Sequence, residues 1–130
     1  AVGPGGVFAL ETKTRSKRTA PPGVKDHEVI FDGKTLRFPW GEDIGAVTQA
    51  TANARWLAEF LSKATGMPVE VFPVIVVPGW YVVGKGNFAV QAMNARYLTK
   101  YLGGLARKLS ASDVQRIAHQ VGQKCRDLEF

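Results

Sequence analysis

The chain has 130 residues, of which 45% are hydrophobic and 22% charged, a composition that excludes disordered and fibrous proteins and is typical of one globular domain. A formal net charge of +6 favours a polyanionic partner, such as nucleic acid or acidic lipid. Cys125 is the only cysteine, so an internal disulfide is excluded and a reducing, cytoplasmic location is expected. No apolar run approaches the ~20 residues that a membrane-spanning helix requires.

The chain opens with a turn that leads into an apolar strand. Residues 3–6 read Gly-Pro-Gly-Gly, and residues 7–13 follow as a strand. A strand after such a turn is expected to be the second half of a β-hairpin. We therefore expect the first half to lie ahead of Ala1 and the single domain, residues 1–130, to be truncated at its N-terminus.

Glu11 and Lys13 close this strand and share one face, because alternate side chains of an extended strand point the same way. The pair suits a hydrolytic metal site, in which a carboxylate binds a divalent cation and a lysine orients a water or stabilises charge on a phosphate. Both residue types are also common where a strand meets solvent. On these two residues alone, the solvent-exposed interpretation is the better supported.

A basic, irregular segment follows, with Arg15, Lys17 and Arg18 ahead of a Pro-Pro-Gly break. It is either an arm that contacts phosphates or a solvated charged loop. The pattern itself favours the solvated loop slightly, and the arm is the functional hypothesis.

Two short strands are expected next, at residues 28–31 and 34–38. Asp32-Gly33 separates them, and Asp-Gly between alternating runs is a strong hairpin signal. The segment Pro39-Trp40-Gly41 is then expected to close this part of the sheet.

Helical spacing begins at residue 44 and continues to residue 64, with one apolar stripe. Core packing is the expected role of Trp56 beside that stripe, and Gly66 is expected to stop the helix. Gln49 and Asn53 are four positions apart, so their amides lie one above the other. Without further context, an exposed polar flank is the better interpretation of these two amides.

The second half of the chain is expected to form three strands and two helices, at residues 69–77, 80–83, 88–93, 95–102 and from Ser110 onward. The first of these strands is apolar in its second half, as in a strand covered on both faces. Asn94 is a good N-cap, and Ser110 followed by Asp113 is a second helix-start signal. The elements together predict an α/β (α+β) fold, a mixed sheet flanked by helices.

Several of these stretches, in this order, resemble the nuclease-related domain (NERD) family. They are Gly6-Val7-Phe8-Ala9-Leu10-Glu11-Thr12-Lys13, Val47-Thr48-Gln49-Ala50, Pro73-Val74-Ile75-Val76-Val77 and Leu109-Ser110-Ala111-Ser112-Asp113-Val114. The resemblance covers nearly the whole chain. It implies a restriction-endonuclease-like core of the PD-(D/E)xK superfamily and a metal-dependent nuclease acting on DNA or RNA, and it makes the metal site the preferred interpretation.

The resemblance also implies roles for individual residues. Glu11 would bind Mg²⁺ or Mn²⁺, Lys13 would position the attacking water or stabilise negative charge, and Gln49 would support the site or contact a phosphate. Several relatives carry an aromatic residue four positions after this glutamine, where this chain has Asn53. That departure weakens the inference that Gln49 has the role of the family's glutamine.

The family's upstream aspartate has no counterpart, because the sequence begins too late to include it. It would lie on a segment ahead of Ala1, come from another copy of the chain, or be replaced by Asp26, Glu28 or Asp32; the first alternative is preferred. Without it, one carboxylate is a poor cage for Mg²⁺.

Two rival functions stay open beside the nuclease. The chain is alternatively an inactive nucleic-acid-binding module of the same fold, or a protein-interaction or membrane-associated regulatory domain that uses its basic surface elsewhere. A missing neighbour of the strand at residues 7–13 would also leave an edge through which two copies associate.

Overall fold

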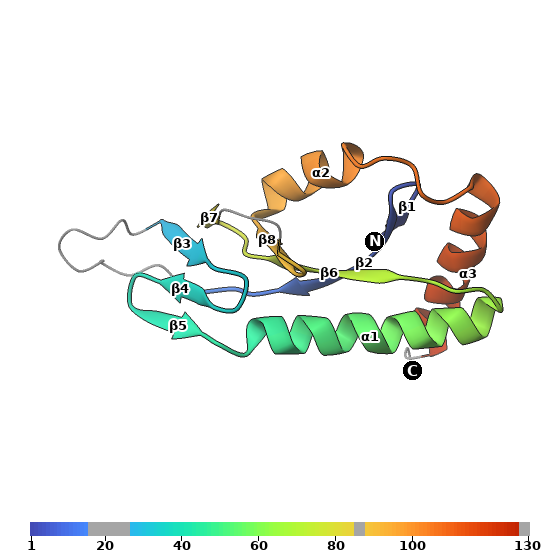
Figure 1. Cartoon of the computed structure of the whole chain (residues 1–130), viewed down its shortest axis with the longest axis horizontal. Helices are drawn as coiled ribbons and strands as arrows, with labels where there is room; N and C mark the ends of the chain where they lie inside the picture. The colour runs from blue at the N-terminus through green and yellow to red at the C-terminus, as the bar shows by residue number, and fades with distance from the viewer. Residues whose placement is uncertain (16–26, 85–87, 128–130) are drawn as a thin grey trace.

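A computed structural model describes residues 1–15, 27–84 and 88–127, with side chains through residue 124. These residues form eight strands and three helices (Figure 1). In chain order they are β1 (Val2–Gly3), β2 (Gly6–Thr12), β3 (Glu28–Phe31), β4 (Leu36–Phe38), β5 (Gly41–Asp43), α1 (Ala46–Thr65), β6 (Val71–Val76), β7 (Tyr81–Val83), β8 (Gln91–Met93), α2 (Ala95–Gly103) and α3 (Ala111–Asp127).

The strands form two mixed sheets of four strands each. The first has the order β1-β2-β6-β8, with β2, β6 and β8 parallel and β1 antiparallel to β2. The second has the order β5-β4-β3-β7, with β7 parallel to β3 and the other pairs antiparallel. The prediction of a mixed α/β architecture is confirmed, and the finer prediction of a restriction-endonuclease-like core stays a prediction.

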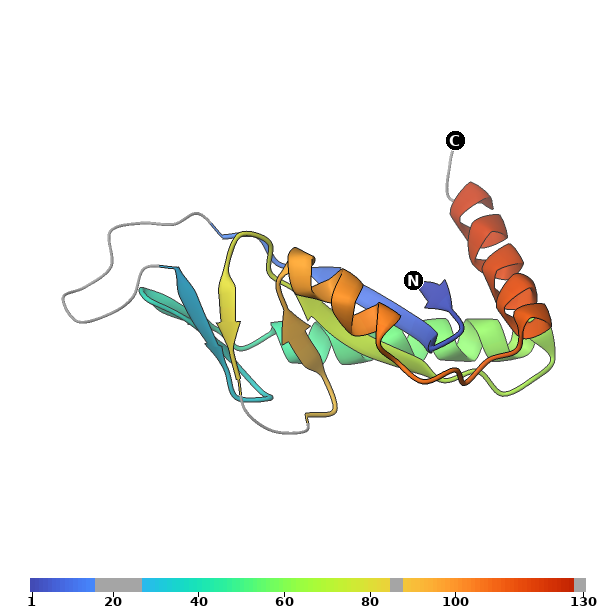
Figure 2. The ribbon, with the colours of Figure 1, turned by 90° about the horizontal axis from the view of Figure 1, so that it is seen from above.

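Helices cover both faces of the first sheet, α1 on one side and α2 on the other (Figure 1). Strand β2 shows why, since its alternating apolar residues face both ways: Val7 packs with Leu61 and Ile117, and Phe8 with Met93. The second sheet lies beyond the N-terminal end of α1 (Figure 2). None of the described helices is long and apolar enough to cross a membrane.

The Asp-Gly signal marks the turn between β3 and β4, as predicted. Gly33 has a φ of 91°, a conformation that glycine adopts without strain. The Asp32 carboxylate accepts hydrogen bonds from the backbone N–H groups of Thr35 and Lys34, which lower its pKa to about 2. A Cβ on Gly33 would lie 2.6 Å from the ring of Phe88, so the turn also abuts that ring.

The sequence analysis does not predict the bounds of two short strands. Val2–Gly3 pairs with Gly6 and Val7, so the residues next to the turn in the first half of the hairpin lie within the chain, and its continuation ahead of Ala1 stays a prediction. Gly41–Asp43 extends the second sheet past the point where the prediction closes it. Each strand has only two or three residues and lacks apolar alternation, so neither produces a recognisable pattern.

The prediction that Trp56 packs in the core is wrong. Its side chain is 54% exposed and stacks on Phe60 at 5.8 Å, with the Lys124 ammonium over both rings. The buried stripe of α1 consists of Ala46, Ala50, Ala54 and Leu61. Trp56 therefore lies on the flank of the helix. The strand expected at residues 88–93 is also shorter, since β8 comprises Gln91–Met93.

Candidate active site at the end of strand β2

Glu11 and Lys13 point together at the C-terminal end of β2. The Lys13 backbone N–H donates to the Val76 carbonyl at 2.9 Å, so the parallel ladder with β6 continues past the end of β2. Lys13 Nζ lies 3.9 Å from Glu11 Oε1, which is consistent with the predicted shared face. Each side chain is only 18% exposed. The two charges are therefore held together and only partly exposed to water.

Two amides of α1 complete the arrangement. Lys13 Nζ donates to Gln49 Oε1 at 3.0 Å, and Asn53 Nδ2 donates to Glu11 Oε2 at 3.0 Å. The four side chains form a continuous row in the order Gln49, Lys13, Glu11, Asn53, which we term the β2–α1 polar cluster. Asn53, whose presence weakens the family comparison, is the residue that contacts the candidate metal ligand.

Small residues on α1 allow these contacts. Ala50 and Ala54 are 1% and 4% exposed and face the sheets, where alanine permits close approach of the helix. Gln49 and Asn53 each precede one of these alanines, so the same approach brings their amides to β2. The spacing of four residues predicts that the amides stack, but only the packing of α1 on the sheet shows what they contact.

The Glu11 carboxylate keeps capacity for a further ligand. A separation of 3.9 Å exceeds hydrogen-bond length, so Lys13 attracts this carboxylate without a direct bond. Oε2 accepts one hydrogen bond, from Asn53. An ionised carboxylate has about four acceptor positions, so most of them are left for a cation or a water.

The cluster fits Mg²⁺ or Mn²⁺ only as part of a shared coordination shell. Within the described residues, no three His, Cys, Asp or Glu side chains are grouped so that they could hold a metal ion. Glu11 supplies one carboxylate, and Asn53 Oδ1 is a neutral oxygen next to it. Because Mg²⁺ commonly binds one or two carboxylates together with substrate phosphates, the phosphate and water would have to complete the shell.

The internal acids proposed as replacements for the upstream aspartate have other positions. Asp26 lies outside the described residues. Glu28 is on β3 of the second sheet, in register with Tyr81 of β7. Asp32 is bound within its own turn and to Arg37 at 3.1 Å. The structure therefore brings neither Glu28 nor Asp32 into the β2–α1 polar cluster.

Arg15, predicted to bind nucleic acid, is engaged by the protein. Its guanidinium lies 2.6 Å from Asp43 Oδ2 and 5.7 Å from the centre of the Phe38 ring. Its carbonyl accepts a hydrogen bond from Trp80 Nε1. Lys17 and Arg18 lie outside the described residues, so phosphate contacts by this segment stay a prediction.

The edge of β2 next to the cluster is open. β1 pairs with the first residues of β2, and Ala1 exchanges two backbone hydrogen bonds with Phe8, both of 2.8 Å. From Ala9 to Thr12, no described strand pairs on this side. A shallow groove of about 470 Å³ lies along it, lined by Ala1, Phe8, Ala9, Leu10, Asn53, Trp56 and Leu57.

Comparisons with known proteins found no family model, curated protein or solved structure that matches the chain. The resemblance to the nuclease-related domain family therefore rests on the stretches of sequence in which it was seen. The β2–α1 polar cluster and the charge of the chain are the features that bear on its function.

Proposed function

We propose that this chain is a divalent-metal-dependent nuclease with a restriction-endonuclease-like core, which hydrolyses phosphodiester bonds of DNA. The proposal rests mainly on the β2–α1 polar cluster, in which a carboxylate and an ammonium are both 18% exposed and are each held by an amide of α1. Charged side chains on an ordinary strand end extend into water instead. The net charge of +6 supports a polyanionic substrate.

Each residue of the cluster has a role in this proposal. Glu11 binds the cation, and Asn53 fixes the orientation of its carboxylate. Lys13 stabilises negative charge on the phosphate or orients the attacking water, and Gln49 fixes the direction of its ammonium. When bound, Mg²⁺ or Mn²⁺ would supply Lewis-acid polarisation of a phosphoryl oxygen.

A second carboxylate would complete the site, and the hairpin indicates where it belongs. Ala1 lies opposite Phe8, so in a strand continued ahead of Ala1 the next three residues would face Ala9, Leu10 and Glu11 in turn. Residues directly opposite each other share a face of the sheet. An aspartate at the third of these positions would thus lie beside Glu11, in the open edge of β2.

The test is a cleavage assay on plasmid DNA with Mg²⁺ or Mn²⁺ and with EDTA. It compares the chain of residues 1–130 with a chain extended ahead of Ala1 that carries an aspartate at that third position. We expect metal-dependent cleavage by the extended chain and its loss in the variant Glu11→Gln. Glu59→Gln is the matched control, because Glu59 is an exposed glutamate of α1.

Two results would reject the proposal. One is equal cleavage by the extended chain and by its Glu11→Gln variant. The other is the absence of any metal-dependent product from the extended chain, with the fold shown intact by circular dichroism.

A second candidate function is DNA binding without cleavage. The specific observation in its favour is that the cluster holds a single carboxylate and that the Lys13 ammonium is already bonded to Gln49. This function predicts binding that weakens steeply with salt and yields no metal-dependent product. The same cleavage assay, with a binding measurement at two salt concentrations, distinguishes the two functions.

Self-association through the open edge of β2 is a further part of the proposal. Backbone groups of an unpaired edge strand can form a ladder with another chain, and Leu10 is 40% exposed there. Sedimentation velocity of the wild type and of Leu10→Lys tests this, since an edge lysine opposes pairing. A monomeric wild type at high concentration contradicts it.

A further inference from the structure

Two adjoining hollows lie on the α2 side of the molecule, away from the β2–α1 polar cluster. The first, of about 350 Å³, is lined by aromatic and amide side chains, among them Tyr81, Phe88, Tyr97, Tyr101 and Gln91. The second, of about 490 Å³, is lined by residues that include His27 and Arg96. Tyr81 and Asn94 line both. We term the first hollow the tyrosine cleft.

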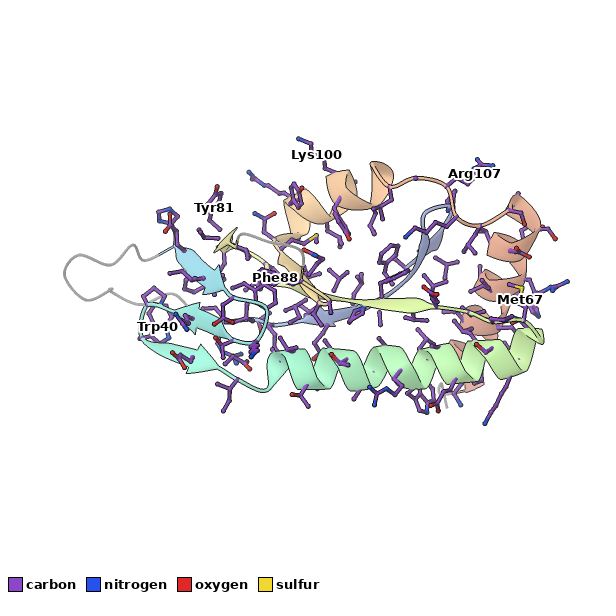
Figure 3. All side chains as sticks on the ribbon, viewed as in Figure 1. Trp40, Met67, Tyr81, Phe88, Lys100 and Arg107 are labelled. Atoms are coloured by element: carbon purple, nitrogen blue, oxygen red, sulfur yellow. The ribbon has the colours of Figure 1, made fainter. Side chains whose placement is uncertain are left out.

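The tyrosines of this cleft present flat ring surfaces to solvent. Tyr81 is 59% exposed and Tyr97 51% exposed. Tyr97 and Tyr101, four residues apart on α2, stack with ring centres 6.4 Å apart and planes 30° apart. Figure 3 shows Tyr81 at β7, on the side where α2 begins, and Phe88 lower in the view, close to β8. Exposed rings gathered around a cavity are suited to stacking with a planar ligand.

Two amides in the wall of the cleft each keep one hydrogen-bonding group that bonds to none of the described residues. Gln91 Nε2 donates to the Phe88 carbonyl at 2.9 Å, so its Oε1 is available as an acceptor. Asn94 Oδ1 accepts the Tyr97 backbone N–H at 2.7 Å, so its Nδ2 is available as a donor. Both side chains are held by these bonds. A fixed acceptor and a fixed donor match the edge of a nucleobase, which presents the same two kinds of group.

The charges around the cleft favour an anion attached to the planar ligand. Among the described residues that line the two hollows, none is acidic. Arg96 lines the second hollow, and Lys100 extends from the outer surface of the same helix (Figure 3). A nucleotide combines a planar ring system with a phosphate, and 350 Å³ is within the range of small-molecule sites.

We propose that the tyrosine cleft binds an unstacked base of single-stranded DNA, with the adjoining phosphate toward Arg96. The site does not depend on the proposed cleavage, because Glu11 and Lys13 contact α1 whereas the cleft is built on α2. If the chain is a nuclease, this site gives it a preference for strands whose bases are exposed.

The experiment measures binding of a fluorescent oligodeoxyadenylate and of an abasic strand of equal length, in EDTA so that no cleavage occurs. Both strands carry the same phosphates, and only the first carries bases. Aromatic stacking contributes on the order of tenfold or more to affinity per base. We therefore expect the oligodeoxyadenylate to bind about tenfold more tightly than the abasic strand.

Three variants locate the effect. Tyr97→Ala should lower the affinity for oligodeoxyadenylate to that for the abasic strand, while Tyr97→Phe, which keeps the ring, should retain most of it. Trp56→Ala is the matched control, because Trp56 is an exposed aromatic residue on α1 outside the cleft. Tyr97 is on the surface, so its loss should leave the fold intact by circular dichroism.

Equal affinity of the wild type for the two strands overturns the proposal. So does a Tyr97→Ala variant that keeps the preference for bases, or a Trp56→Ala variant that loses it as fully. Failure of the nuclease proposal has a different signature, namely no metal-dependent product while the preference for bases persists.

Discussion

Two ion pairs near the end of β2 differ in the distance between their charges and in the other groups that their carboxylates bind. Glu11 and Lys13 are 3.9 Å apart, are both 18% exposed, and are each bonded to an amide of α1. Arg15 and Asp43 are 2.6 Å apart, with Arg15 41% and Asp43 10% exposed. Asp43 also accepts hydrogen bonds from the backbone N–H groups of Gly45 and Ala46, at the start of α1.

The difference separates structural charge from charge available to a ligand. Asp43 uses both carboxylate oxygens within the protein, to fasten the segment after β2 and the start of α1. Glu11 has oxygen lone pairs that no described residue uses at hydrogen-bond distance. We therefore expect Lys13 and Arg15, only two positions apart in the sequence, to differ in function, and four predictions test this comparison.

The largest expected effect comes from comparing Lys13→Ala with Arg15→Ala in the extended chain. Removing one group that stabilises developing charge costs roughly 10²–10³-fold in rate, so Lys13→Ala should reduce metal-dependent cleavage by about that factor. Arg15→Ala should change the cleavage rate little. The measurement is initial cleavage rate at saturating metal; the opposite order of effects would move the site to Arg15.

Asp43→Ala should have the largest effect on stability. It removes the acceptor for two backbone N–H groups at the start of α1 and the partner of Arg15. We expect a loss of about 1–2 kcal/mol in the free energy of unfolding, measured by urea denaturation. Asp43→Asn keeps one acceptor oxygen and should lose less. Equal losses in both variants would contradict the role of the backbone contacts.

Asn53→Asp sharpens the comparison by adding a carboxylate next to the Glu11–Lys13 pair. The new group would lie beside Glu11 Oε2, which Asn53 Nδ2 contacts at 3.0 Å. Two carboxylates in contact repel unless a cation lies between them. We expect the melting temperature to fall in EDTA and to recover in Mn²⁺. Thermal unfolding in the two buffers measures this change. Gln49→Glu is the control, because it would adjoin the Lys13 ammonium and should need no metal.

The smallest effect concerns a third ion pair, Asp32 with Arg37, on the exposed hairpin turn. Folding lowers the pKa of Asp32 from 3.8 to about 2, chiefly through the backbone N–H of Thr35. A depressed carboxyl pKa stabilises the fold above pH 4, and this contribution is lost as the pH falls toward 2. Asp32→Asn should therefore flatten that part of the pH-stability curve, and Glu70→Gln should not.

Local signals explain most of the agreement between sequence and structure. The shared face of Glu11 and Lys13 follows from the period of a strand, and the Asp-Gly turn from its glycine. The helix starts at Asn94 and Ser110 follow from capping, as Asn94 Oδ1 bonds to the Tyr97 N–H and Ser110 Oγ to the Asp113 N–H. Each of these signals acts within a few residues.

The features that the sequence does not predict depend on how segments distant in the sequence pack together. Nothing near Asn53 in the sequence indicates that it meets Glu11, because that contact requires α1 to lie across β2. Trp56 is a large aromatic residue of the kind that is common in protein cores, but the flank of α1 where it lies is covered only in part. The tyrosine cleft likewise joins β7, β8 and α2, so its members are recognisable only once these elements are side by side.

The contact between Gly33 and Phe88 links two parts of the surface that are separate in sequence. A methyl group at position 33 would push against an aromatic ring that lines the tyrosine cleft. Substitutions of Gly33 at the hairpin tip would thus displace the Phe88 ring and change the shape of the cavity. During evolutionary divergence, residues 33 and 88 should change together or stay as they are.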